Sequence, residues 1–296
     1  MSVSPEDLRR FLRGRGWRLG TTSCFKEAPL VDNVRALAGA VDDVELVLFD
    51  APQGNNWPSP AQVRELSDLA ERYRLSFTPH IPCHLGHISL DSAWLRRSLE
   101  WVRRSVDLLE SLHPLAYVWH WEAEQFGAVP ARDLTRWLDS LRELAGAVAA
   151  ERLIEPRRLA VETLSYPFDL IAALVEEHDF GVTMDVGHLW RGGYDWRDFW
   201  QRWAPRGVSV HLHGVNCKGD DHLGLDALNP ALLQCFMERL SDAPSVSERL
   251  GDAPSVSERL GDATPSASAR SLSVEVFSEL EWCRSLASLQ RLRYSP

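Results

Sequence analysis

A carboxylate and an imidazole three residues apart, Asp185 and His188, end an apolar β-rich run in FGVTMDVGHLW. Ligand-type side chains end comparable runs elsewhere in the chain, at His80, His120, Glu162, His211 and Glu275. Carboxylates and imidazoles together suit Zn²⁺, Mn²⁺ or Fe²⁺ better than Mg²⁺ or Ca²⁺, which prefer all-oxygen sites. The sequence therefore predicts a metal-dependent enzyme, with enough ligands for roughly two or three divalent ions. Zn²⁺ is the favoured ion, and Mn²⁺ and Fe²⁺ are the alternatives.

A second group of polar residues lies in and after the seventh β-rich run. His213 shares a strand face with His211, because side chains two residues apart point the same way. Asp220, Asp221 and His222 follow in KGDDHLGL. A single inward-facing His or Glu in a barrel is commonly just a hydrogen-bonded interior residue, and either aspartate could equally be a solvated turn residue. Placement of so many ligand types at the same end of six runs favours metal binding by the set.

Eight β-rich runs alternate with amphipathic helical patterns and must position these side chains. The runs are 18–23, 43–50, 75–82, 115–121, 158–164, 180–186, 207–215 and 271–278. The alternation predicts an α/β fold, and eight repeats favour a closed (β/α)8 TIM barrel over an open doubly wound sheet. We expect a single barrel domain over residues 1–296, with the ligands at the carboxyl ends of the strands, where such barrels carry their active sites.

One segment interrupts this alternation. The decapeptide DAPSVSERLG occurs at 242–251 and again, identical, at 252–261, and DATPSASAR follows it. Two copies without an aromatic residue cannot build a core, and repeat architectures need about three units or more. We therefore expect a low-complexity surface insertion over 242–270, between the seventh helix and the eighth strand, with no catalytic role.

Composition narrows the class of partner. The chain has 296 residues, a net charge of −10 and five cysteines. The acidic balance makes nucleic acid an unlikely partner, because phosphates would need a basic surface. The scattered cysteines form no CxxC pair and fit free thiols in a reducing compartment. The polar N-terminus and the lack of an apolar run of about 20 residues predict a cytoplasmic protein without a membrane partner.

The order of the ligand-type residues resembles a known superfamily. The phrases HIP, WHW, VET, MDVGHL, HLHG, DDHL and VEV follow one another as in the xylose isomerase-like TIM barrels. That superfamily includes sugar isomerases and epimerases and the endonuclease IV-type phosphodiesterases. A four-ligand subset resembles the isomerase and epimerase pattern: Glu162, Asp185, His211 and Glu275. The additional histidines resemble the trinuclear zinc arrangement of the endonuclease IV branch: His80, His120, His188 and His222.

This resemblance implies three ion positions. His80 and His120 would serve one ion, with Glu162 bridging to the next. The second ion would be held by Asp185, His211 and Glu275. The third would be held by His188, His222 and an aspartate from 220–221.

Longer phrases resemble one subfamily, the bacterial cobamide-remodelling phosphodiesterases. They are LGTTS, NVRALAGAVDDVELVLFD, ETLSYPFD, MDVGHL and HLHGV followed by DDHLGLD. The resemblance covers most of the chain except the insertion and the extreme termini. It implies a cobamide (a B12-type corrinoid) as the substrate, and hydrolysis of its nucleotide loop. The product would be a cobinamide-type compound that can be rebuilt with another lower ligand.

Further roles follow from that reading. Asp221 is the candidate for orienting or deprotonating the attacking water, and His213 for donating a hydrogen bond to the phosphate or supporting a metal ligand. Tyr166 and Trp121 are candidates for stacking on the corrin or benzimidazole.

Other functions remain open at this point. A sugar isomerase or epimerase would use Glu162 and Glu275 as its acid/base pair and leave His80, His120 and His188 without a role. A repair nuclease of the endonuclease IV type is disfavoured by the acidic charge. A non-catalytic corrinoid-binding or metal-storing protein would need no open coordination position.

Overall fold

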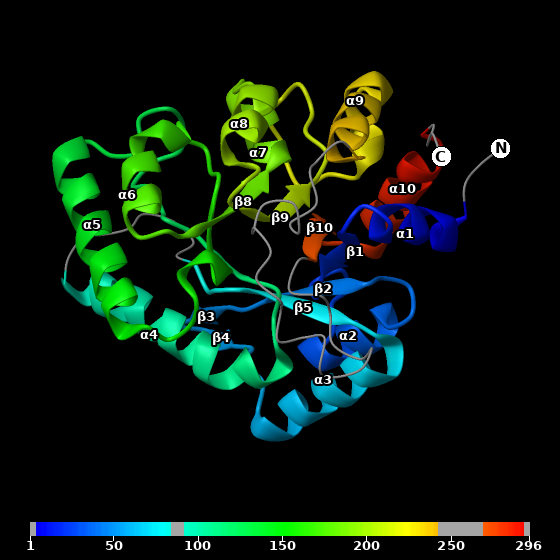
Figure 1. Ribbon diagram of the computed structural model, residues 1–296, viewed down its shortest axis with the longest axis horizontal. Helices are drawn as coiled ribbons and strands as arrows, with labels where there is room; N and C mark the ends of the chain where they lie inside the picture. The colour runs from blue at the N-terminus through cyan, green and yellow to red at the C-terminus, as the bar shows by residue number, and fades with distance from the viewer. Residues whose placement is uncertain (1–3, 84–91, 242–268, 293–296) are drawn as a thin grey trace, which may run out of the picture.

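Eight parallel strands close into a barrel in the computed structural model, which describes residues 4–83, 92–241 and 269–292 (Figure 1). The barrel strands are β1 (Trp17–Thr22), β2 (Asp43–Val47), β5 (Ser76–His80), β6 (Tyr117–Trp119), β7 (Leu159–Glu162), β8 (Gly181–Asp185), β9 (Gly207–Leu212) and β10 (Arg270–Val274). Each strand pairs with its neighbour in this order, and β1 closes the circle by pairing with β10. The prediction of a (β/α)8 barrel is confirmed, and each strand overlaps one predicted run, although several strands end three or four residues before their runs do.

Helices surround the barrel and alternate with its strands along the chain, as the amphipathic patterns predict. They are α1 (Pro5–Arg13), α2 (Leu30–Leu37), α3 (Pro60–Tyr73), α4 (Ser92–Leu109), α5 (Leu134–Glu151), α6 (Ala172–Glu177), α7 (Val186–Gly192), α8 (Trp196–Trp203), α9 (Pro230–Ser241) and α10 (Glu279–Gln290). A capping box starts α3, because Ser59 Oγ accepts from the Gln62 N–H and Gln62 Oε1 accepts from the Ser59 N–H. A short hairpin, β3 (Asp50–Ala51) and β4 (Gly54–Asn55), follows β2.

The two faces of β2 explain how the barrel is packed. Val44 and Leu46 are fully buried and belong to the apolar core. The residues that alternate with them, Asp43 and Glu45, are acidic and are fully buried as well. Side chains two apart share a face, so these two carboxylates stand on the opposite face, inside the barrel. Asp43, at the start of β2, accepts hydrogen bonds from the hydroxyls of Ser76 (2.5 Å), Thr78 (2.9 Å) and Ser271 (2.8 Å). The interior of the barrel is therefore a polar, hydrogen-bonded stack.

The predicted insertion falls almost wholly outside the described residues. Its tandem repeat at 242–261 is among the residues not described, and in the chain it falls between α9 and β10. Arg270, the last residue assigned to the insertion, already pairs with Trp17 of β1 and so belongs to the barrel. None of the helices in the described residues combines the length and apolar character that a bilayer span requires.

Candidate metal centre

The first cluster of ligand atoms comes from three neighbouring strands. His80 ends β5, His120 follows β6 and Glu162 ends β7. His80 Nε2 lies 3.2 Å from His120 Nε2 and 3.4 Å from Glu162 Oε2, and His120 Nε2 lies 2.9 Å from the same oxygen. The Nδ1–H of His80 donates to the Ile81 carbonyl (3.0 Å), which leaves the lone pair of Nε2 facing the cluster.

These three separations suit a single tetrahedral ion. Zinc binds nitrogen and carboxylate oxygen at about 2.0–2.2 Å, so the edges of its tetrahedron are roughly 3.3 Å long. The distances of 2.9, 3.2 and 3.4 Å lie close to that edge. An ion at the centre would thus need only a small adjustment of the surrounding side chains.

The second cluster shares Glu162 with the first. His211 Nδ1 lies 3.2 Å from Glu162 Oε1, 3.1 Å from Glu275 Oε2 and 4.0 Å from Asp185 Oδ2. One ligand atom from each of these four buried residues lies within 4.8 Å of the others. Because Glu162 turns Oε2 toward the first cluster and Oε1 toward the second, it is placed to bridge two ions.

The DVGH sequence sets the geometry between the second and third clusters. Asp185 ends β8 and caps α7, since its Oδ1 accepts from the backbone N–H of His188 (2.7 Å). The Nδ1–H of His188 donates to the Thr163 carbonyl (3.0 Å), so Nε2 is the nitrogen left for a ligand. Gly187 is required by packing, because a Cβ there would lie 2.1 Å from Cε1 of His213.

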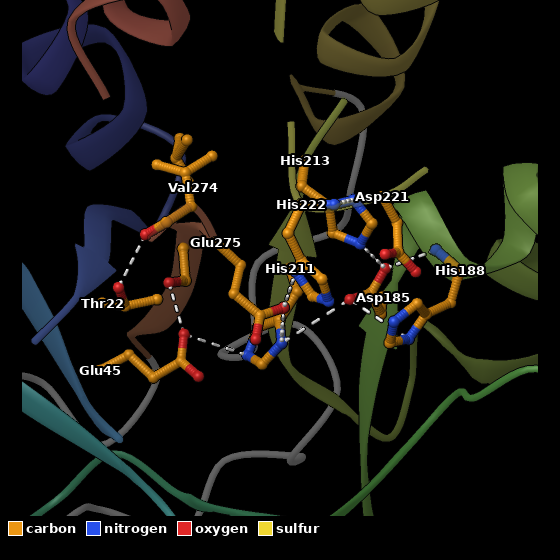
Figure 2. A network of polar contacts seen from close by, with 12 residues as sticks. Thr22, Glu45, Asp185, His188, His211, His213, Asp221, His222, Val274 and Glu275 are labelled. Carbon is orange, nitrogen blue, oxygen red and sulfur yellow. Dashed lines mark hydrogen bonds and ion pairs between the residues drawn. The ribbon is translucent and has the colours of Figure 1, made fainter. Parts of the chain in front are cut away.

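The third cluster consists of three histidines. His188, His213 and His222 place one ring nitrogen each within 4.8 Å of one another, and Figure 2 shows their rings beside Asp185. His222 takes a left-handed backbone conformation (φ 52°), and its N–H donates to His213 Nδ1 (3.0 Å). His213 Nε2 lies 3.1 Å from Asp185 Oδ1.

His213, and neither of the two expected aspartates, is the third residue grouped with His188 and His222, while the aspartate ligand of a third ion stays a prediction. Asp220 instead accepts a hydrogen bond from the Asn216 side chain (2.7 Å) and so closes its own turn. Asp221 forms an ion pair with Arg191 of α7. Both carboxylates are thus held by other partners, and the group of close ligand atoms around His188 contains neither of them.

Burial and unsatisfied atoms show that the centre fits cations. Several ligand atoms are buried without a hydrogen bond among the described residues, namely Glu162 Oε1, Asp185 Oδ2, His211 Nδ1, His222 Nδ1 and Glu275 Oε2. Buried polar atoms without partners are costly, and cations bound at the second and third clusters would satisfy these atoms. The donor set fits a divalent transition metal or zinc better than Mg²⁺ or Ca²⁺.

The pKa values of the centre reflect the same packing. Burial alone would raise the pKa of Glu162, but the facing His211 and His120 rings lower it well below its ordinary value. Burial alone would lower the pKa of His80 and His213. Glu162 raises that of His80 to about 9, and Asp185 raises that of His213 to about 9. Without an ion, Glu162 therefore remains charged, and His80 and His213 hold protons that an ion would displace.

The sequence as a whole matches a known family. The profile described as the xylose isomerase-like TIM barrel covers residues 32–279. The chain belongs to the xylose isomerase-like TIM barrel family. The broader of the two resemblances found in the sequence is thereby confirmed.

Solved structures within this fold include both epimerases and nucleases. A D-tagatose 3-epimerase-like protein is 17% identical, with a TM-score of 0.63, and the match covers 90% of this chain and 94% of that one. Endonuclease IV from Thermus thermophilus is 16% identical, with a TM-score of 0.62 and coverage of 92% and 99%. An IOLI protein with a bound zinc atom is 14% identical, with a TM-score of 0.55 and coverage of 93% and 94%. Identities this low establish the shared barrel and nothing finer. A search of curated proteins finds no significant match.

Within this xylose isomerase-like barrel, the eight predicted ligands all join one cluster or another: His80, His120, Glu162, Asp185, His188, His211, His222 and Glu275. The predicted substrate contacts lie elsewhere. Tyr166 and Trp121 are buried, the Tyr166 hydroxyl donates to the Trp121 carbonyl (2.6 Å), and the Tyr166 ring packs edge-on against Trp137. Neither ring has a face open to a ligand, because both are built into the packing around the barrel.

Glu45 is a site residue that the sequence reasoning did not single out. It is fully buried and belongs, with His80 and Glu275, to a further group of close ligand atoms. Burial raises the pKa of Glu45 to about 7, although His211 beside it acts in the opposite direction. The signal was present in DVELV, where acidic residues alternate with apolar ones in a run otherwise read as a strand.

Proposed function

We propose that this protein is a metal-dependent phosphodiesterase that hydrolyses the nucleotide loop of cobamides to a cobinamide-type product. The observation that carries the proposal is the pair of histidine-containing clusters on either side of the four-ligand set. The pattern of a sugar isomerase or epimerase corresponds to the four-ligand set alone. It gives no role to the cluster of His80 and His120 or to the cluster around His188.

The proposed reaction is the hydrolysis of one phosphodiester bond. Water adds to phosphorus, one ester P–O bond breaks, and the leaving alcohol takes up a proton. Two or three divalent ions, with Zn²⁺ favoured and Mn²⁺ or Fe²⁺ as alternatives, would lower the pKa of water and neutralise charge on the phosphoryl oxygens.

The protein's own part is to orient and separate the ligands. Glu162 joins two clusters, and the Thr163 and Ile81 carbonyls fix which nitrogen His188 and His80 present. His213 touches both Asp185 and His222 and so connects the second cluster to the third. Asp221 remains the candidate for orienting the water, with Arg191 holding its carboxylate.

Exposed rings beside the third cluster support a large substrate. Phe126 is 84% exposed, and the guanidinium of Arg191 lies 5.7 Å from its ring centroid. Phe277, also exposed, lies 5.0 Å from the ring of His222. An exposed aromatic ring beside the Arg191 guanidinium could stack against a flat apolar group while the cation contacts a phosphate attached to that group. The phrases that resemble cobamide-remodelling enzymes make a corrinoid the favoured substrate, and the net charge of −10 disfavours duplex DNA.

Incubation of zinc-loaded or manganese-loaded protein with cobalamin tests the proposal. Chromatography with mass detection should show a cobinamide-type product. Recovery of intact cobalamin, together with turnover of a keto-sugar by the same preparation, would contradict it and favour an epimerase built on the four-ligand set.

A single substitution sharpens this test. His188→Ala removes a ligand of the third cluster and should lower hydrolysis by about 10²–10³-fold, as loss of one electrostatic contact to the transition state does. The matched control is His113→Asn. His113 is exposed, lies outside all the clusters and has a left-handed backbone that Asn tolerates. Hydrolysis undiminished in the His188 variant would remove the third cluster from the mechanism.

A further inference from the structure

Glu45 occupies a position in the barrel where a carboxylate is expensive. It lies in the middle of β2 and its side chain has no exposed surface. A buried carboxylate without a specific partner costs several kcal/mol or more, so its neighbours indicate what it does. The ligand clusters stand at the strand ends, and Glu45 lies beneath them, with Asp43 one step further inside.

Two side chains lie close to the same carboxylate oxygen of Glu45, Oε2. The hydroxyl of Ser273 in β10 donates to Oε2 (2.7 Å), which fixes the orientation of the carboxylate. His211 Nε2 lies 3.5 Å from that oxygen (Figure 2). Glu45 thus faces the nitrogen of His211 that points away from Glu162 and Glu275.

The opposite nitrogen of His211 faces the second cluster. Nδ1 lies 3.1 Å from Glu275 Oε2 and 3.2 Å from Glu162 Oε1. A neutral imidazole carries one proton and can present a lone pair from only one nitrogen. A ligating histidine commonly donates its other N–H to a carboxylate, which fixes the tautomer and strengthens the ligand.

We propose that Glu45 is a positioning residue that holds the His211 proton on Nε2, so that Nδ1 presents its lone pair to an ion bound with Glu162, Asp185 and Glu275. Ser273 and Glu45 are joined by a hydrogen bond, and His211 Nε2, which has no hydrogen-bond partner among the described residues, lies 3.5 Å from the same carboxylate oxygen. This proposal concerns metal binding and does not depend on which ester the protein cleaves.

Asp43 offers a matched control two residues along the same strand. It is fully buried and shares the barrel-facing side of β2 with Glu45. Among the described residues, its side chain accepts hydrogen bonds from hydroxyls alone, those of Ser76, Thr78 and Ser271. Loss of its charge should therefore cost stability without changing the tautomer of a ligand.

The experiment compares Glu45→Gln with Asp43→Asn in the full-length protein. Competition against a chelator measures zinc affinity, and the spectrum of the cobalt-substituted protein reports the ligand field. Glu45→Gln should weaken binding at the second cluster by about 10–100-fold, with the number of ions at saturation unchanged. Asp43→Asn should keep the wild-type affinity and spectrum.

Two results would overturn the proposal. Equal zinc affinities and cobalt spectra for the two variants would remove the link to His211. Loss of a whole ion at saturation in Glu45→Gln would make Glu45 a ligand instead. If neither variant folds, NMR of ¹⁵N-histidine-labelled, zinc-loaded wild-type protein decides. The proposal requires the proton of His211 on Nε2, and a proton on Nδ1 contradicts it.

Discussion

Replacing Gly187 by Ala should disturb the third cluster without removing any ligand. A Cβ at this position would lie 2.1 Å from Cε1 and 2.4 Å from both ring nitrogens of His213. Ordinary contacts begin near 3.4 Å, so the ring must retreat by about 1.3 Å or α7 must shift. The ring is held by the His222 N–H (3.0 Å) and lies 3.1 Å from Asp185, so neither contact survives such a movement intact.

The expected cost has two parts. Overpacking of this kind typically destabilises a protein by about 1–3 kcal/mol, which denaturant unfolding of the EDTA-treated protein would measure. Displacement of His213 should also weaken the third ion by about 10–100-fold, which zinc titration against a chelator would measure. The first cluster should keep its ion, because its ligands His80, His120 and Glu162 come from β5, β7 and the end of β6 and not from the Asp185–His188 turn.

Gly146→Ala is the matched control. Gly146 lies inside α5, and a Cβ there meets no atom within 4 Å. This variant should gain up to about 1 kcal/mol from helix propensity and leave metal binding unchanged. The reasoning is refuted if Gly187→Ala matches Gly146→Ala in both stability and zinc affinity.

Three further predictions concern the protonation of the centre and the groups around it. The pKa of His80 and that of His213 are raised to about 9 from 6.5, so in metal-free protein their stabilising contribution is complete below about 6.5 and is lost as pH rises through 9. The thermal unfolding midpoint of EDTA-treated protein should therefore decrease as the pH is raised from about 6.5 to about 9. A midpoint that does not change over this pH range would contradict the assignment. Arg191→Ala should raise KM for cobalamin while the metal content stays constant, because Arg191 holds Asp221 and lies beside an exposed ring; an unchanged KM would exclude it from substrate binding. Tyr166→Phe should cost about 1 kcal/mol of stability through its lost hydrogen bond, with KM unaffected because the ring is buried; a raised KM would restore Tyr166 as a substrate contact.

The strand ends were predictable because their side chains obey simple rules. A buried parallel strand is a short apolar run, and the carboxyl ends of such strands meet at one face of a barrel. His80, Glu162 and Asp185 each end such a run, so their convergence follows once eight strands are counted. In DVELV, acidic residues alternate with apolar ones, which indicates a buried carboxylate at Glu45. Glu45 lies in the middle of its strand, so a prediction based on strand ends does not include it.

The third cluster was only partly predictable, because loop geometry decides it. Whether His213 or an aspartate stands beside His188 depends on the left-handed backbone at His222 and on the turn closed by Asp220, neither of which has a clear sequence pattern. The burial of Tyr166 was equally hidden, since an aromatic residue just after a strand can pack outward or face the mouth.

Anomalous diffraction from crystals of zinc-loaded protein tests the central claim most directly. The account predicts zinc peaks at the cluster of His80, His120 and Glu162 and at the four-ligand cluster, with a third peak beside His188 and His222. A single peak within the four-ligand cluster, at full zinc loading, would contradict the account and return the protein to the isomerase pattern.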